Sequence, residues 1–328
     1  RWLRGLGLEP RVIDAHEVRC KTHRKSQKSD SRDAFEICDG LRRDIYRAYV
    51  HVPPPEVEAL RAALMQRRHF VRLQTLEVNA AKYVLRAAGL EVHGRRSLKT
   101  QRGWDRLLGQ LDACAPQQAE AVRAHLAVWQ AATAQVAALD KRLQDLTRGF
   151  RDRIALLREI PGVGFVIAAT IVAVLSDVER FADSKHVASY AGLVPRTYNS
   201  GERQLHGRIS KRGNPELRAM LCQAAQKARQ PGNPFHPYYR KLCAKRGHKI
   251  AVIAVASRIL RVAWTMLRDG ESFSLARLGV EAGPFERSTT DRYRLKPSGR
   301  SAGSAGAARE AQAPSTKAPA AAAQQPVC

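Results

Sequence analysis

The stretch "FADSKHVASYAGLVPRTYNSGERQLHGRISKRGNPELRAMLCQAA", residues 181–225, decides what kind of fold this chain is expected to adopt. Within it, "GLVP" predicts the end of a helix, "YNSG" predicts a turn, and "GERQLHGRISKRGN" predicts a hairpin dense in Arg and Lys. Asn214 suits a helix N-cap and Pro215 suits the first helical position, so a new helix is expected there. The segment therefore predicts a mainly helical region that carries a basic hairpin.

The expected turn contains Ser200, a candidate nucleophile. A serine hydroxyl in an exposed turn can attack a phosphodiester if nearby cations stabilise the charge of the transition state. The cations expected to surround it are Arg203, Arg208, Lys211 and Arg212. In the alternative interpretation this is an ordinary Ser-Gly turn, and the basic residues only hold phosphate. The residues alone leave both interpretations open.

Upstream, "LLREIPGVGFVIAATIVAVL" at residues 156–175 predicts two helices joined by a Pro-Gly-Val-Gly turn. This pattern is similar to a helix-hairpin-helix, in which glycines such as Gly162 and Gly164 let backbone N–H groups approach a DNA phosphate. The alternative is a tight turn whose glycines serve packing only.

Long helices are expected from Pro55 to about Ala88 and from about Pro116 to Arg158, with an Arg- and Gly-rich loop reaching Trp104 between them. The second helix carries apolar residues at alternating spacings of about three and four. This seam suits an antiparallel helical arm or a dimeric coiled coil, and equally an ordinary bundle helix. Its members are Val122, Leu126, Trp129, Thr133, Val136, Leu139, Leu143, Leu146 and Phe150.

At the other end of the chain, residues 1–7 predict a helix end, residues 10–18 a short buried strand, and the residues after them a basic loop. A helix capped by Ser29 follows, which places Asp30 and Asp33 on one face, one turn apart. Two such carboxylates can share a hard cation such as Mg²⁺, although one helix supplies few ligands. Alternatively, they only complement the helix dipole.

The 328 residues suffice for about two domains, and 56 Lys and Arg against 30 acids give a formal net charge of +26. So strong an excess favours a polyanionic partner, nucleic acid above all.

The six scattered cysteines form no CxxC pair, which argues against a zinc site and a disulfide framework. No apolar run reaches the ~18–20 residues of a membrane span, and "FVIAATIVAVL" comes closest. The Ala-, Ser- and Pro-rich end predicts a disordered tail.

Together these stretches resemble the DEDD-type transposases of the insertion sequence 110/116/902 family, which includes bridge-RNA-guided recombinases of the serine type. The resemblance covers nearly the whole chain except the tail. It rests on "KSDSRDA" (28–34), "LEVNAAKYVLRAAGL" (76–90), "IPGVG" (160–164) and the stretch 181–225 quoted above.

The resemblance implies an α/β plus mostly α architecture. The expected parts are the C-terminal part of an RNase-H-like (RuvC-like) domain at 1–52, a helical linker and coiled-coil arm at 53–158, a mainly helical transposase domain at 159–270, and the tail at 271–328. In this family four acids, Asp, Glu, Asp and Asp, hold Mg²⁺. Asp30 and Asp33 match the last two. The first two would precede Arg1, so the chain is expected to be an N-terminally truncated copy.

The family's nucleophile is a serine, and Ser200 occupies the matching position, with Ser184, Ser189 and Ser210 as weaker candidates. The implied function is cleavage and rejoining of DNA during transposition. The implied partners are donor and target DNA, a structured RNA as a candidate guide, and further copies of the chain in a dimer or tetramer. No membrane is implied, and the expected location is the bacterial cytoplasm at the nucleoid. The alternatives are an inactive nucleic-acid-binding remnant and a nuclease that uses metal alone.

Overall fold

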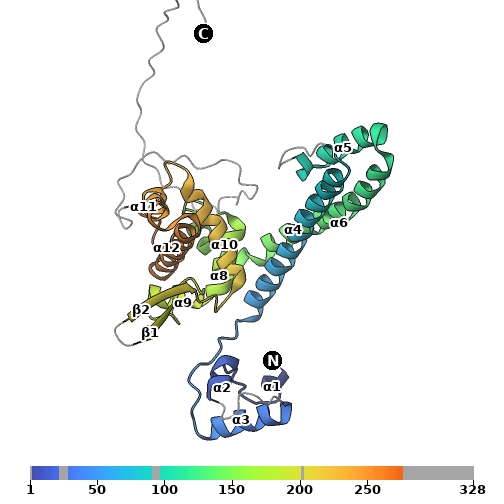
Figure 1. Ribbon diagram of the computed structural model, residues 1–328. Helices are drawn as coiled ribbons and strands as arrows, with labels where there is room; N and C mark the ends of the chain where they lie inside the picture. The colour runs from blue at the N-terminus through green and yellow to red at the C-terminus, as the bar shows by residue number, and fades with distance from the viewer. Residues whose placement is uncertain (1, 22–28, 91–96, 201–202, 276–328) are drawn as a thin grey trace, which may run out of the picture. The chain divides into compact units, whose positions relative to one another are not determined.

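The structure is a computed structural model that describes residues 2–21, 29–90, 97–200 and 203–275 (Figure 1). The chain divides into Arg1–Thr289 and Thr290–Cys328, and the second unit lies outside the described residues. The described part is mostly helical and contains a two-stranded antiparallel sheet. The expectation of a mainly helical chain is therefore confirmed. A RuvC-like sheet is not among the described residues, and that part of the expectation stays a prediction.

The N-terminal segment contains three short helices, α1 (Trp2–Gly5), α2 (Ala15–Lys21) and α3 (Asp30–Arg42). The predicted cap of α3 is confirmed, because Ser29 Oγ accepts the N–H of Arg32 at 3.3 Å. The buried strand expected at residues 10–18 is wrong. A single antiparallel bridge joins Ile13 to Tyr49, Val12 is 46% exposed, and the chain is already helical from Ala15. A strand needs a partner along its length, and the described residues supply one for a single position.

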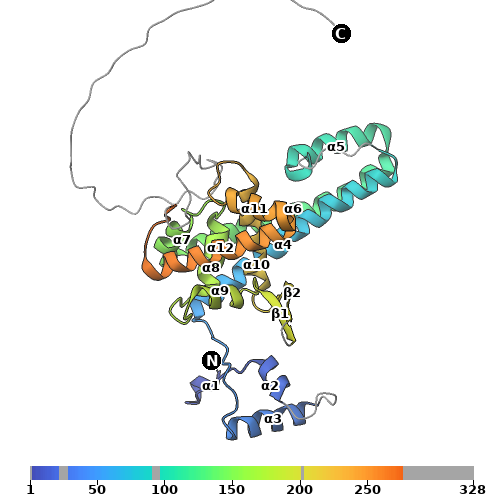
Figure 2. The same ribbon diagram turned by 60° about the vertical axis from the view of Figure 1, so that its left-hand side comes forward.

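The arm begins with α4 (Pro55–Ala87), where Pro55 occupies the predicted first helical position. The elements that follow are a short 3₁₀ turn η1 (Ser97–Lys99), α5 (Gln101–Cys114), α6 (Pro116–Leu146), a second 3₁₀ turn η2 (Arg148–Phe150) and α7 (Arg151–Leu157). Helices α4 and α6 lie side by side in both views (Figures 1 and 2).

The two long helices run antiparallel, as three side-chain contacts between them show. Arg67 Nε donates to Asp140 at 2.5 Å, Gln74 Nε2 donates to Thr133 Oγ1 at 2.8 Å, and His125 Nδ1 lies 2.7 Å from Glu77. As the residue numbers rise along α4, they fall along α6. The seam on α6 therefore packs within its own chain, as in an antiparallel pair of helices, and the coiled-coil arm stays a prediction.

The loop expected to reach Trp104 ends earlier than predicted, because Trp104 lies inside α5 and is fully buried. Residues 91–96 of that expected loop lie outside the described residues. Its ring lies 5.8 Å from that of Trp129 on α6, and both belong to a cluster with Leu85 of α4. Thr100 caps the helix by accepting the N–H of Gly103. Burial of these side chains stabilises α5. The Arg and Gly content of the segment before Trp104 instead predicts a loop.

The C-terminal region is built around α8 (Phe165–Leu175) and α12 (His248–Asp269). The other elements are α9 (Ser184–Tyr190), β1 (Pro195–Ser200), β2 (Arg203–Ile209), α10 (Pro215–Ala225), a 3₁₀ turn η3 (Gln226–Arg229) and α11 (His236–Arg246). Helix α8 buries nearly all of its side chains, and α9, α10 and α11 pack against α12. Asn214 caps α10 by accepting the N–H groups of Glu216 and Leu217, as its sequence predicts.

Among the described helices, α12 is long and apolar enough to cross a membrane by length and composition. The expectation that residues 165–175 come closest to a membrane span is therefore wrong. Half of the apolar window of α12 is buried inside the protein, and length and composition alone are weak evidence for a membrane span.

Residues just after α12 pack onto this region, in the range where a disordered tail is expected. The N–H of Phe273 donates to Glu159 Oε2 at 2.8 Å, and its ring lies 6.3 Å from that of Phe235. The rest of the expected tail, residues 276–328, lies outside the described residues.

Candidate functional site

Asp30 and Asp33 occupy the first turn of α3, and both side chains are exposed. Neither carboxylate forms a hydrogen bond or an ion pair with another described residue. Two free carboxylates on one helix face fit a hard cation such as Mg²⁺, which proteins commonly hold with one or two carboxylates and the phosphates of the substrate. In the described ranges no cluster of three or more His, Cys, Asp or Glu could hold a metal. The pair therefore offers part of a coordination sphere.

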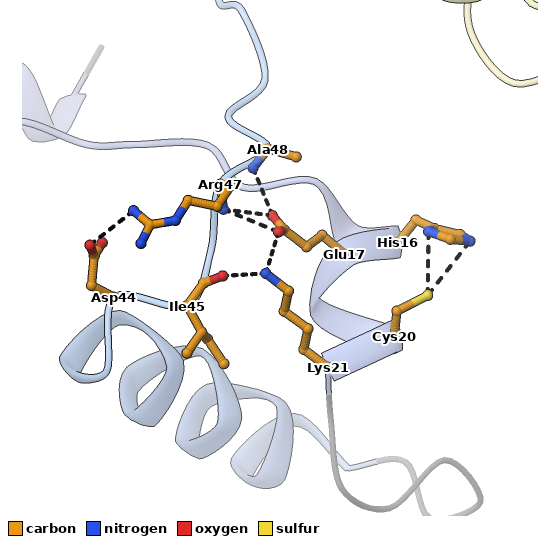
Figure 3. Close-up of polar contacts among 8 residues, drawn as sticks. All are labelled: His16, Glu17, Cys20, Lys21, Asp44, Ile45, Arg47 and Ala48. Carbon is orange, nitrogen blue, oxygen red and sulfur yellow. Dashed lines mark hydrogen bonds and ion pairs between the residues drawn. The ribbon is translucent and has the colours of Figure 1, made fainter.

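A network around Glu17 ties α2 to the chain that follows α3 (Figure 3). The Glu17 carboxylate accepts the N–H of Arg47 at 3.0 Å and that of Ala48 at 2.7 Å. Lys21 Nζ lies 2.5 Å from the same carboxylate and also donates to the carbonyl of Ile45. Because these contacts lie on both sides of the segment that carries Asp30 and Asp33, Glu17 closes that segment into a loop.

The same contacts hold the pKa of Glu17 far below its usual range, at about 2. The largest cause is the hydrogen bond from Lys21, followed by the N–H of Ala48. Sequence reasoning missed this residue. The Glu17 and Lys21 spacing is a signal for an ion pair within a helix, but nothing local indicates backbone partners about thirty residues away.

A carboxylate whose pKa is lowered on folding stabilises the fold above its unfolded pKa, and this contribution is lost as the pH falls through the folded value. We therefore expect the N–H groups of Arg47 and Ala48 to keep their hydrogen-exchange protection from pH 7 to about 4.5 and to lose it progressively toward about 2. Glu17→Gln should lower that protection already at pH 7. Protection factors, corrected for the intrinsic exchange rate at each pH, measure the effect.

Asp44→Asn provides the matched control, because Asp44 pairs with the guanidinium of Arg47 at 3.0 Å and not with its N–H. It should leave the protection of both N–H groups unchanged. Equal losses in the two variants would contradict a specific role for Glu17.

Ser200 and Arg203 lie opposite each other where β1 and β2 pair last. The strands pair from Pro195 with Ile209 to Ser200 with Arg203, with an irregularity between Pro195 and Thr197. The hairpin is thus shifted from its predicted position, because residues 198–200 form the end of a strand where a turn is expected. The shift places Ser200 at the outer end of the ladder.

The expected ring of cations around Ser200 is wrong in part. Arg203 is its partner, but Arg208 lies near the opposite end of the ladder, and Lys211 and Arg212 lie beyond it. Arg208, Lys211 and Arg212 are exposed, and the Arg212 guanidinium lies 3.0 Å from His16 Nε2. With about 3.3 Å per strand residue, the two ends of the ladder are roughly 17 Å apart. The basic residues therefore follow the hairpin as a stripe.

Gly162 and Gly164 lie in the turn between α7 and α8, as predicted, but their surroundings differ. Gly162 has φ +95°, and a Cβ there would lie 2.7 Å from the carbonyl oxygen of Ala224. Gly164 is the N-cap of α8, and a Cβ there would meet nothing within 4 Å. Gly162 is thus required by packing, whereas Gly164 leaves open space next to the first N–H groups of α8.

We expect Gly162→Ala to lower the free energy of unfolding by about 2 kcal/mol or more, since it adds a positive-φ penalty to a clash with backbone. Gly164→Ala should cost less than about 1 kcal/mol, the range of an N-cap change. Denaturant titrations measure both values.

If a phosphate approaches the start of α8, Gly164→Ala should also weaken DNA binding with little loss of stability. Unchanged DNA affinity would contradict a phosphate contact at the start of α8 and leave Gly162 with a packing role only.

Residues 154–240 match the family model described as "Transposase IS116/IS110/IS902 family". A probable family 20 transposase of Pseudomonas aeruginosa is 29% identical over 272 residues, which is 81% of this chain and 79% of the relative. The transposase for insertion sequence element IS1111A of Coxiella burnetii is 25% identical over 284 residues, 83% of this chain and 75% of the relative. A pilin gene-inverting protein of Moraxella lacunata is 31% identical over 125 residues, 37% of this chain and 38% of the relative.

Proposed function

Starting from the membership of this chain in the IS116/IS110/IS902 transposase family, which its residues 154–240 carry, we propose that it cleaves and rejoins DNA strands with Ser200 as the nucleophile. The observation that supports this assignment most is the position of Ser200. It ends β1 opposite Arg203, on the hairpin that lies inside the matched region. The names of the relatives, transposases and pilin gene-inverting proteins, agree with such an activity.

In the proposed step, Ser200 Oγ attacks a phosphorus atom of the DNA backbone. An Oγ–P bond forms as the bond from phosphorus to a sugar oxygen breaks, and that oxygen leaves as a hydroxyl. Because the phosphoserine ester conserves the energy of the phosphodiester, a sugar hydroxyl of another strand can reverse the step without an external energy source. We propose that Arg203, the backbone partner of Ser200 in the ladder, supplies the charge that stabilises the phosphate in this step.

Asp30 and Asp33 would hold a divalent cation, for which Mg²⁺ is the expected choice. When bound, such an ion polarises phosphoryl oxygens and neutralises charge that develops on the leaving oxygen. The two carboxylates are suited to this because they are exposed and form no bond with another described residue. We further propose that they belong to a RuvC-like four-acid site, and that Glu17 acts as a positioning residue for the loop that carries them.

DNA is the proposed main partner, and the basic stripe of Arg208, Lys211 and Arg212 is the proposed contact to its backbone. A structured guide RNA and assembly as a dimer or tetramer remain parts of the proposal, as does a location at the bacterial nucleoid. The net charge of +26 supports a polyanionic partner in each case.

The function is tested by incubating the chain with DNA that carries the ends of an insertion element, in the presence of Mg²⁺, and separating the products under denaturing conditions. A protein–DNA adduct that resists denaturation, together with rejoined strands, is the expected result. Cleavage without an adduct would instead favour a nuclease that uses metal alone. Binding without either product would favour a catalytically inactive remnant.

A further inference from the structure

A cavity of about 530 Å³ lies in the C-terminal region, and neither Ser200 nor the basic stripe is among its lining residues. Helix α9 contributes Ser184 to its lining, β1 contributes Pro195, α11 contributes Tyr238, and α12 contributes Arg258 and Arg261. The remaining lining combines hydroxyl groups with apolar side chains. No Asp or Glu is among the described residues that line it.

The positive character of the cavity extends through the surrounding sequence, because residues 217–268 contain no Asp or Glu at all. Arg258 and Arg261 are three residues apart on α12 and therefore share one face of that helix. The Arg258 guanidinium lies 4.8 Å from the centre of the Tyr238 ring. Guanidinium groups bind phosphate through paired N–H donors and also stack on planar rings.

The size of the cavity limits what can occupy it. A volume of about 530 Å³ lies in the range of small-ligand sites, so it suits one nucleotide and excludes a duplex. Apolar walls from Leu193, Val262 and Met266 suit the face of a base, while the serines and arginines suit phosphate and sugar. A base can enter such a pocket only when it is unpaired.

The cavity is also connected to the proposed nucleophile through β1. Pro195 lines the cavity and begins the strand that ends at Ser200. At about 3.3 Å per residue, that strand spans roughly 17 Å, which equals about five nucleotide steps along the axis of a DNA duplex. A strand bound at Ser200 can therefore reach the cavity. We propose that the cavity holds one unpaired nucleotide of the DNA strand that the hairpin processes, an inference that rests on the proposed function.

The test compares two variants that each remove one exposed cation from α12. Arg261 lines the cavity, whereas Lys249 lies in the first turn of the helix and does not. With the full chain at fixed salt, Arg261→Ala should weaken binding of a labelled single-stranded DNA by about tenfold and duplex binding by about twofold or less. Lys249→Ala should weaken both slightly and equally, since it changes only the general charge. A 2-aminopurine base placed in the single strand should report the loss of base binding in Arg261→Ala as a change in its fluorescence emission.

A second variant fills the cavity without changing the charge. Ala254 lies in the lining, so Ala254→Leu should reduce single-strand affinity as Arg261→Ala does, while leaving duplex binding and the melting temperature nearly unchanged. If this variant fails to fold, the comparison of Arg261→Ala with Lys249→Ala decides the question.

Equal losses in Arg261→Ala and Lys249→Ala would overturn the inference, because binding would then be spread over the basic surface. The inference would also be overturned if a single-stranded RNA of the same sequence binds more tightly than the DNA and if Arg261→Ala removes this preference for RNA. The cavity would then hold an RNA nucleotide. If the wild-type chain still forms a covalent DNA adduct in either case, the inference fails and the proposed function stands. If the wild-type chain binds no DNA at all, both the inference and the proposed function are wrong.

Discussion

Replacing Ser200 by alanine is expected to abolish the covalent protein–DNA adduct and to lower strand rejoining by about 10³-fold or more. Alanine lacks the hydroxyl that would form the bond to phosphorus, and no neighbouring water can create the same protein-linked product. Denaturing gels of the wild-type and variant chains, incubated with the same DNA, measure both quantities. DNA affinity should be nearly unchanged, because the basic stripe is intact.

Ser210→Ala is the matched control. Ser210 follows the same hairpin, its N–H donates to the carbonyl of Val194 at 2.9 Å, and its Oγ is buried without a hydrogen-bond partner in the described structure. Loss of that hydroxyl should therefore be tolerated, and the adduct should persist. An adduct that persists in Ser200→Ala would refute the assigned nucleophile and move attention to Ser184 and Ser189.

Asp30→Asn and Asp33→Asn are each expected to lower metal-dependent cleavage by about a hundredfold or more, while DNA affinity stays equal or rises slightly. An amide keeps the size of the side chain but loses the charge that would hold a divalent cation. Cleavage rates at increasing Mg²⁺ concentration measure the effect, since a weakened metal site should require more metal. If the aspartates only complement the helix dipole, each change should cost about 0.3–1 kcal/mol of stability and leave cleavage intact.

Asp39→Asn controls for the loss of one acid from the same helix. Asp39 pairs with Arg42 at 2.9 Å and with Arg43 at 3.4 Å, which lower the pKa of its carboxyl. Its replacement should remove a surface ion pair with little effect on cleavage. A loss of cleavage equal to that of Asp30→Asn would indicate a general effect on α3 and contradict a metal site.

The successful local predictions depend on residues that act on their own backbone. Ser29 and Asn214 cap helices because their side chains accept N–H groups two or three residues away. Pro55 begins a helix because its fixed φ suits that position. The residues that carry the family resemblance could be predicted for a related reason, because they lie in short motifs that follow one another in a fixed order. The Asp pair and the glycine turn occupy the places on helices that those motifs predict.

The failed predictions depend on partners that are distant in the sequence. Trp104 forms a helix because it packs against Trp129, and the segment at residues 10–18 lacks a strand because its partner contributes a single bridge. The hairpin register also depends on pairing between two strands. Ser200 is predicted in a turn but lies at the end of β1, and the cations predicted around it are spread along and beyond the hairpin.

The sequence by itself predicted the family resemblance, the positive charge and the place of Asp30 and Asp33 on a helix, because motif order and composition are properties of the chain alone. Only the tertiary structure decided which glycine of the turn is required by packing, which carboxylate closes the loop around the aspartates, and where Arg258 and Arg261 form a cavity. Each of these depends on groups brought together from distant positions, and their contacts arise from packing that no local pattern encodes.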